Sequence, residues 1–379
     1  MPASDVPKLP DRFWTQPDVF GVGRLESRPP LVPFPDARAA RSGVRSDSPW
    51  FRSLDGRWRF LLVDRPEASP AGWADPDHDD RPWKRVDVPG NWTLQDVGDG
   101  PHYTNVIMPF GGEPPEVPDD NPTGLYRRTF RVPRGWAGRR TILHVGGAES
   151  VVSVWVNGRF VGLGKDSRLA SEFDVSPWLR SGQNVVGLQV IRWSDASWLE
   201  DQDHWWMAGL HREVFLRSQG RPALGALSVT AGLADPDPSA SAQTGTISIE
   251  AEVDVAGNPQ TGWSVRTRIE EWHRSSNAVH EASADVGVRD GSSRLADMVS
   301  SFIYRGTTAR IQGEIEGVRP WSHESPTRFR LLVSLVDPDG TMVGCTQRTL
   351  QTNRQGTDAE QDASDLWASI SEATTELTS

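Results

Sequence analysis

The sequence predicts an all-β protein, in which a jelly-roll domain is followed by an immunoglobulin-like β-sandwich. Two observations predict this class. Short apolar runs alternate with turn-forming clusters of Gly, Pro, Asn and Asp, and helical periodicity is nearly missing between residues 48 and 216. Many short strands joined by turns are typical of sandwiches rather than of helical or α/β folds.

Residues 48–218 are expected to form the jelly roll. Within them, residues 151–162 predict a hairpin, because the central pair Asn157-Gly158 supplies the two positive φ angles of a type I′ turn. Apolar or alternating runs predict further strands over residues 56–63, 125–132 and 185–191.

Residues 219–351 predict the second sandwich. Residues 245–253 alternate cleanly, and residues 328–336 form an apolar run that ends in the turn sequence 337–340. Roughly seven short strands over this length fit an immunoglobulin-like fold that lacks its disulfide.

Three segments carry no strand pattern. Residues 1–47 are rich in Pro and Arg and predict an extended arm that lies over a surface. Residues 114–122 contain four prolines, which cannot donate to a ladder, so they predict an irregular loop. Residues 352–379 are polar and predict a mostly disordered tail, with a hint of a helical turn at 366–370.

Composition excludes several classes of partner. The net charge is -11 and the chain has no basic patch, which argues against nucleic acid or an anionic membrane. No apolar run approaches the ~20 residues that span a bilayer. A single cysteine, Cys345, and a first segment without signal-peptide features indicate a cytoplasmic protein. Of the 17 Trp, six are expected to be mainly structural: Trp58, Trp73, Trp83, Trp92, Trp155 and Trp178.

An acidic run from Arg192 to Asp203 follows the strand predicted at 185–191. Carboxylates beside indoles suit a sugar, because oxygens accept hydrogen bonds from hydroxyl groups and an indole covers the C–H face of the ring. Glu200, Asp201 and Asp203 allow two interpretations. They are a catalytic pair for glycoside cleavage, or they are loop acids that are solvated, cap backbone amides or hold a cation.

Several motifs then resemble the N-terminal part of the LacZ-type β-galactosidases of glycoside hydrolase family 2. The resemblance runs in register over residues 11–216 and more weakly to about 350. Its motifs are residues 53–60, 88–92, 103–106, 121–124 and 164–174, and the acidic run itself.

The resemblance implies a jelly-roll sugar-binding domain, an immunoglobulin-like domain and then a (β/α)₈ barrel that carries both catalytic glutamates. Such a barrel takes about 250 residues, so we expect no catalytic residue in this chain. Asn105 and Asp203 match family residues that contact the galactosyl group. Asp203 also matches a sodium ligand, with an incomplete shell here because the other ligands lie in the barrel.

The resemblance also implies a second, magnesium site in part of the family, from which this sequence departs. Asp195 matches one ligand, but Phe13, Gln16 and Lys165 stand where the pattern has aspartate, asparagine and glutamine. An apolar ring and a cation would defeat a divalent site, so we expect no magnesium there.

Two matched residues also have a structural interpretation. Asn105 is a sugar ligand or a residue that satisfies turn backbone. Arg168 is expected to be an internal ion-pair partner rather than a sugar ligand.

Three functional hypotheses follow. The chain is the non-catalytic N-terminal portion of a β-galactosidase, and it works with a barrel-bearing partner chain or in a homo-oligomer. Alternatively, it is a stand-alone carbohydrate-binding module that uses Trp198, Trp205 and Trp206 with Asp203, or an inert remnant.

Overall fold

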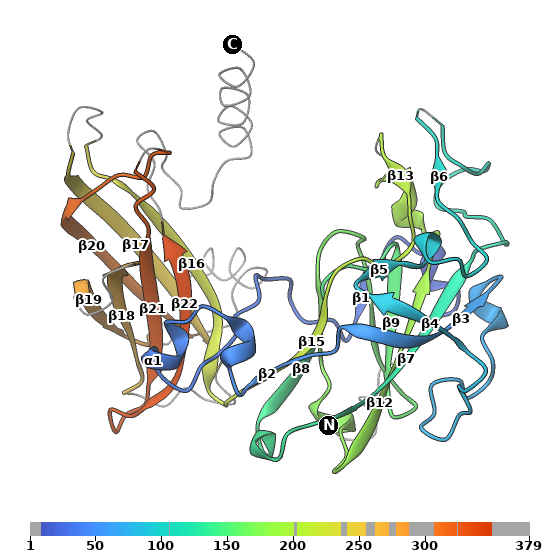
Figure 1. Cartoon of the computed structure of the whole chain (residues 1–379), viewed down its shortest axis with the longest axis horizontal. Helices are drawn as coiled ribbons and strands as arrows, with labels where there is room; N and C mark the ends of the chain where they lie inside the picture. The colour runs from blue at the N-terminus through green and yellow to red at the C-terminus, as the bar shows by residue number, and fades with distance from the viewer. Residues whose placement is uncertain are drawn as a thin grey trace, which may run out of the picture. The chain divides into compact units, whose positions relative to one another are not determined.

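The computed structural model describes residues 9–105, 107–200, 203–235, 241–254, 262–272, 278–287, 307–323 and 325–350. The chain divides into two compact units (Figure 1). The first comprises Met1–Arg28 and Trp50–Gln219, and the second comprises Pro29–Pro49 and Gly220–Ser379. The tail predicted at 352–379, with its helical turn at 366–370, lies outside the described residues.

The first unit is a two-layer antiparallel sandwich, and the all-β prediction is confirmed. One layer is a seven-stranded sheet in the order β1 (Gly21–Val22), β10 (Arg159–Lys165), β9 (Val151–Val156), β12 (Gln183–Ile191), β7 (Thr123–Arg131), β3 (Gly56–Val63) and β4 (Lys84–Val88). The other is a four-stranded sheet in the order β11 (Ser171–Asp174), β8 (Arg140–Val145), β15 (Val214–Gln219) and β2 (Phe51–Ser53).

The core of this unit lies between the two sheets. Trp58 and Leu188 come from the seven-stranded sheet and join Leu143 and Leu216 from the four-stranded sheet in one buried cluster. Gly124 of β7 leaves room for aromatic packing, because a Cβ there would lie 2.7 Å from the Phe60 ring and 2.8 Å from the Trp92 ring. Burial of large apolar side chains is the main driving force for such a sandwich.

Local sequence signals are confirmed where they are strongest. Strand β3 has the predicted bounds, 56–63. Asn157 and Gly158 have φ angles of 52° and 79° between β9 and β10, as a type I′ turn requires. Residues 114–122 contain no strand.

Two short strand pairs extend the first unit beyond its sheets. Strand β6 (His102–Tyr103) pairs with β13 (Trp205–Trp206), and β5 (Gly90–Asn91) pairs with β14 (Gly209–Leu210). Figure 1 shows β6 and β13 projecting together from one end of the unit. Short 3₁₀ turns occur at η2 (Phe13–Thr15), η4 (Pro66–Ala68), η5 (Trp92–Leu94), η6 (Arg134–Trp136), η7 (Ser176–Trp178) and η8 (Asp195–Trp198).

The second unit is a sandwich with seven described strands, as the immunoglobulin-like prediction requires. A three-stranded sheet has the order β16 (Ala223–Leu233), β17 (Gln243–Asp254) and β20 (Thr307–Val318). A four-stranded sheet has the order β19 (Ala278–Asp285), β18 (Ser264–Glu271), β21 (Phe329–Val336) and β22 (Met342–Leu350). Ile249 of the first sheet and Leu331 of the second share the buried core.

The segment expected to be one arm, 1–47, divides between the two units. Residues up to Arg28 belong to the first unit, where β1 joins the seven-stranded sheet. The following residues belong to the second unit, where they form α1 (Ala37–Ala40) and η3 (Arg45–Asp47). Phe34 makes an antiparallel bridge to Cys345 of β22, so the second part is held by backbone hydrogen bonds.

Candidate functional site

The acidic run leaves the sheet where β12 ends, as the sequence predicts. Strand β12 ends at Ile191, and η8 begins at Asp195. Ser194 and Ser197 cap this turn reciprocally, each side chain bonding the backbone of the other. The run therefore contains η8 and lies between β12 and β13 (Trp205–Trp206) in the chain.

Arg192 at the start of the run is a buried structural residue. It donates from Nη1 to Asp99 Oδ1 at 2.5 Å and from Nη2 to the carbonyl of Gly100 at 3.1 Å. Its guanidinium also lies 4.8 Å from the ring centre of Trp193. These contacts fix the segment that leads into β6.

Two carboxylates of the run are engaged internally. Glu200 accepts hydrogen bonds from the backbone amide of Ser167 at 2.8 Å and from its hydroxyl at 2.5 Å. Asp195 accepts a hydrogen bond from Lys165 Nζ at 2.7 Å. The contacts of Glu200 match the interpretation as a loop acid that caps a backbone amide, and Asp201 lies outside the described residues.

Asp203 differs from them because it is exposed. The Tyr103 hydroxyl donates to Asp203 Oδ1 at 2.8 Å, and this hydrogen bond raises the pKa of Tyr103. The two residues are neighbours because β6 pairs with β13, with Tyr103 opposite Trp205. The sequence analysis did not single out Tyr103 as a partner of Asp203, although it stands two positions before Asn105 in a matched motif.

Asn105 lies just beyond β6 and is exposed. Its side chain makes no hydrogen bond within the part of the chain that the structure describes. Among these residues, no backbone group is bonded to the Asn105 side chain as the interpretation of Asn105 as a turn residue would require. Because β6 and β13 pair antiparallel, Asn105, two residues after Tyr103, and Asp203, two residues before Trp205, lie at the same end of this strand pair.

The three indoles near Asp203 are not equivalent. Trp205 is 54% exposed, and its ring centre lies 5.7 Å from that of Tyr103. Trp206 points the other way and is buried, with its Nε1 donating to Thr104 Oγ1 at 2.8 Å. Trp198 is half-buried and donates to the carbonyl of Glu116. Among these three, Trp205 alone offers an exposed ring.

Elsewhere, the tryptophans expected to be structural are largely confirmed. Trp58, Trp73, Trp83 and Trp92 are buried, whereas Trp155 and Trp178 are half-buried.

Arg168 is an ion-pair partner, as expected, but its own side chain is 46% exposed rather than internal. Its Nη1 lies 3.3 Å from Glu149 Oε2, and its Nη2 lies 3.2 Å from His204 Nε2. Glu149 is buried, and this burial raises its pKa despite the nearby guanidinium. No sequence signal singled out Glu149 or His204, because their partners are brought together only by the fold.

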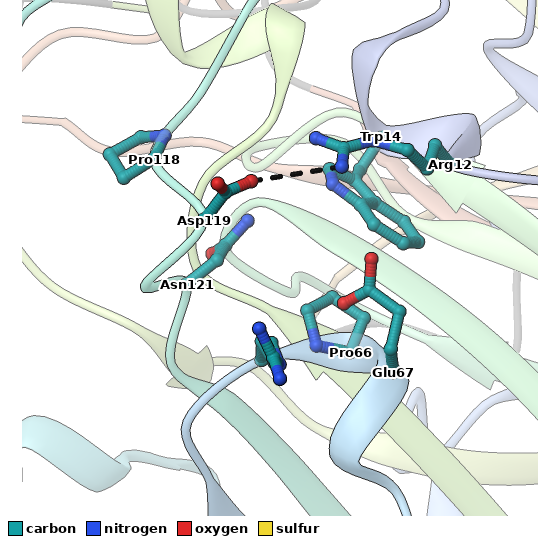
Figure 2. Close-up of a pocket in the computed structure, with 8 residues that line it drawn as sticks. Arg12, Trp14, Pro66, Glu67, Pro118, Asp119 and Asn121 are labelled. Atoms are coloured by element: carbon teal, nitrogen blue, oxygen red, sulfur yellow. Dashed lines mark ion pairs between the residues drawn. The ribbon is translucent and has the colours of Figure 1, made fainter.

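A separate hollow of about 320 Å³ lies on the first unit (Figure 2). Arg12 and Asp119 form an ion pair across one side of it, with 3.7 Å between Nη1 and Oδ1. The amide group of Asn121 in its wall is already bonded at both ends to the backbone of Trp193. None of the predicted site residues lines this hollow.

Every helix in the described part of the chain is far shorter than the about 20 residues that a bilayer-spanning helix needs.

Comparison with solved structures supports the fold. A Bifidobacterium dentium β-glucuronidase complexed with coumarin-3-O-glucuronide aligns with a TM-score of 0.59 and 19% identity, over 80% of this chain and 48% of that chain. A glycosyl hydrolase family 2 member from Bacteroides cellulosilyticus aligns with the same TM-score and identity, over 80% of this chain and 35% of its own.

Comparison of sequences finds a related β-galactosidase and a matching domain family. A β-galactosidase from Psychromonas ingrahamii is 34% identical over 333 residues, which is 88% of this chain. The chain spans 30% of the length of that relative. Residues 51–222 match the family described as glycosyl hydrolases family 2, sugar binding domain. Residues 51–222 therefore carry the sugar-binding domain of the glycosyl hydrolases family 2, and 88% of the chain is similar to part of a β-galactosidase.

Proposed function

We propose that this chain is the non-catalytic N-terminal portion of a β-galactosidase and that Asn105 and Asp203 support the terminal galactosyl group of the substrate. The observation that carries the proposal is the pairing of β6 with β13. It puts an exposed amide, an exposed carboxylate and the exposed ring of Trp205 at one end of the first unit.

These groups have the chemistry that a sugar requires. The Asn105 amide both donates to and accepts from hydroxyl groups, whereas the Asp203 carboxylate accepts from them. Tyr103 occupies Oδ1 of Asp203, which leaves the second carboxylate oxygen available to a ligand. The Trp205 ring adds an apolar surface for the C–H face of the sugar.

Asp203 also fits a partial sodium site. A carboxylate oxygen is the type of ligand that a hard cation prefers. In this proposal the remaining oxygens of the shell come from the barrel and from the substrate, so the chain alone binds sodium weakly.

The bond-breaking groups are proposed to lie outside this chain. Glycoside cleavage takes two carboxyl groups on either side of one bond. In the acidic run, Glu200 is held by Ser167 and Asp195 by Lys165, which leaves Asp203 without a second free carboxylate among the described members of the run.

A barrel-bearing chain is the proposed partner. Four large hydrophobic side chains near the proposed site are exposed, and the partner chain could pack against them. They are Tyr103, Ile107, Leu199 and Trp205. A homo-oligomer of the assembled protein is a further proposal, as is a location in the cytoplasm, which rests on the lone and buried Cys345.

A chimera tests the proposal. Residues 1–350 of this chain replace the matched region of the Psychromonas ingrahamii β-galactosidase, and hydrolysis of a chromogenic β-galactoside is measured. We expect activity in the chimera and none in the purified 379-residue chain. The control is the same relative with the matched region deleted and nothing in its place.

Two outcomes count against the proposal. The first is galactoside turnover by the isolated chain. The second is a chimera that is folded by circular dichroism yet inactive, which favours an inert remnant. Calorimetric titration of the isolated chain with galactose distinguishes the stand-alone binding module, since clear heat at millimolar sugar supports that alternative. One exposed indole and half a site are expected to hold a monosaccharide too weakly for this.

A further inference from the structure

A buried lysine lies at the end of β10, next to the N-terminal segment of the first unit. Lys165 Nζ donates to the backbone carbonyl of Gln16 at 2.8 Å and to Asp195 Oδ1 at 2.7 Å. The side chains of Lys165 and Asp195 are 5% and 8% exposed. A buried ammonium is retained only where a carboxylate and hydrogen-bond acceptors compensate for its lost hydration, and both are present here.

The surrounding charges balance the ammonium. Asp195 pairs with it directly, and Asp18 acts on it electrostatically from the N-terminal segment. Burial lowers the pKa of Lys165, while the hydrogen bond to Asp195 opposes this change. The lysine side chain therefore delivers a positive charge to a place where backbone carbonyl and carboxylate oxygens converge.

The same place is where the family resemblance implies a magnesium ion, and the residues here do not fit one. The Phe13 ring is buried in an apolar cluster. The Gln16 side chain bonds to the carbonyl of Asp11 rather than turning toward Asp195. Among the described residues, no group of three or more His, Cys, Asp or Glu side chains is arranged to hold a metal ion. The Lys165 ammonium, in contact with Asp195, would also repel a divalent ion bound to that carboxylate.

Lys165 is bonded to the N-terminal segment through its backbone as well. Its amide donates to the carbonyl of Phe20 at 3.0 Å, and its carbonyl accepts from Arg24 Nη1 at 3.0 Å. Together with the ammonium bond to Gln16, these contacts hold the stretch from Gln16 to Arg24 at three points.

The held segment supports the floor of the candidate sugar site. Phe13 and Trp14 of η2 pack in one buried cluster with Trp193 and Trp206. Trp206 belongs to β13, and its ring centre lies 5.3 Å from that of Trp193. A contact path thus runs from Lys165 through η2 to the strand pair β6–β13.

We propose that the Lys165 ammonium is a built-in cation that replaces a metal ion and fastens residues 13–24 beneath the strand pair β6–β13. The N-terminal segment is then held in place without any divalent metal. This inference concerns the folding of the first unit and stands apart from the galactosidase proposal.

Thermal unfolding of the full 379-residue chain, followed by tryptophan fluorescence, tests the inference. We expect the same Tm with excess EDTA and with excess magnesium. Lys165→Met is expected to lower Tm by about 10 °C, because it leaves Asp195 buried without its cation. The matched control is Arg81→Met, which breaks the exposed pair of Arg81 with Asp79 and is expected to shift Tm by less than about 2 °C.

Limited trypsin digestion separates local release from global loss of stability. In Lys165→Met, at a temperature well below its Tm, cleavage after Arg12 and Arg24 is expected to be at least about 10-fold faster than in the wild type, because the segment opens locally without global unfolding. Asp195→Asn provides a second variant if Lys165→Met does not fold, with an intermediate drop in Tm expected.

Two results would overturn the inference. One is a wild-type Tm that falls in EDTA and recovers with magnesium. The other is a Lys165→Met or Asp195→Asn variant that unfolds like the Arg81→Met control with unchanged cleavage after Arg12 and Arg24.

Discussion

Asp195 and Asp203 stand in the same acidic run, yet the fold uses them in opposite ways. Asp195 is buried against the Lys165 ammonium, which also donates a hydrogen bond to the backbone carbonyl of Gln16 in the N-terminal segment. Asp203 is exposed, and the hydroxyl of Tyr103 donates a hydrogen bond to it. Both residues are aspartates of one run, so the contacts that the fold brings to each of them determine the difference.

The comparison teaches where a binding group can be found in an acid-rich loop. A buried carboxylate needs a charge partner and has no capacity left for a ligand. An exposed carboxylate with one neutral donor keeps a second oxygen that can accept a hydrogen bond from a ligand. Removal of that donor costs the protein little stability, because water solvates the carboxylate. Free acceptor capacity, rather than the number of acids, distinguishes the proposed sugar site.

The largest expected difference is in stability between Asp195→Ala and Asp203→Ala. Asp195→Ala leaves an uncompensated buried ammonium and is expected to lower the free energy of unfolding by about 3–5 kcal/mol. Asp203→Ala is expected to change it by less than about 0.5 kcal/mol, because the site is exposed. Urea unfolding followed by tryptophan fluorescence measures both, and equal losses would contradict the comparison.

A second buried acid extends the comparison to pH. Glu172 lies between His144 and Arg217 in the four-stranded sheet. Burial alone would raise its pKa, but the His144 hydrogen bond and the Arg217 guanidinium outweigh burial and lower the pKa to about 2. The lowered value means that the native state favours the ionised form, so stability is fully present above the unfolded value near 4.5 and is lost as pH falls toward 2.

This loss is expected to reach about 3 kcal/mol. The measurement is the free energy of unfolding in urea at several pH values between 6 and about 2.5, and its change with pH is compared with the change that the lowered pKa predicts. The matched variant, Glu172→Gln, is expected to be less stable at neutral pH and to show a flatter acid dependence. An equally steep acid dependence in Glu172→Gln would assign the effect to other carboxylates.

At the exposed site, Trp205→Ala is expected to weaken substrate binding without lowering the stability of the fold. Loss of the exposed ring removes apolar contact worth about 1–2 kcal/mol, which is roughly a 10-fold rise in KM for galactoside in the chimera. Its Tm is expected to stay near that of the wild type. Trp206→Ala is the control, because that buried ring should affect Tm first. A Trp205→Ala chimera with unchanged KM would remove the ring from the site.

The smallest effect is expected from Tyr103→Phe. This change deletes only the hydroxyl that donates to Asp203, and the ring opposite Trp205 stays. We expect a KM increase of about two- to fivefold in the chimera, since an exposed hydrogen bond from a neutral donor contributes about 0.5–1 kcal/mol. A larger loss than that of Asp203→Ala would mean that Tyr103 itself contacts the sugar.

Much of the fold could be predicted because its signals are local. The bounds of β3, the Asn157-Gly158 turn and the proline-rich irregular loop each follow from the chemistry of a few neighbouring residues. The ion pair of Arg168 could be expected as well, since a guanidinium readily pairs with carboxylates. Its partner, Glu149, could not be named from the sequence.

The remaining features depend on contacts between distant segments. Lys165 could be seen to spoil a metal site, but its bonds to Gln16 and Asp195 join parts of the chain that no local pattern connects. The role of Tyr103 follows from the pairing of β6 with β13 across about a hundred residues, a register that periodicity alone does not fix. The arm also divides at Arg28 because Phe34 finds a strand partner at Cys345.

The most direct test of the central claim is the activity of the chimera that carries Asp203→Ala. Turnover of a chromogenic β-galactoside is measured together with Tm on the same preparation. The account predicts a fall in kcat/KM of about 10- to 100-fold, the worth of one hydrogen bond to a charged group, at unchanged Tm. Activity equal to that of the unsubstituted chimera would contradict it.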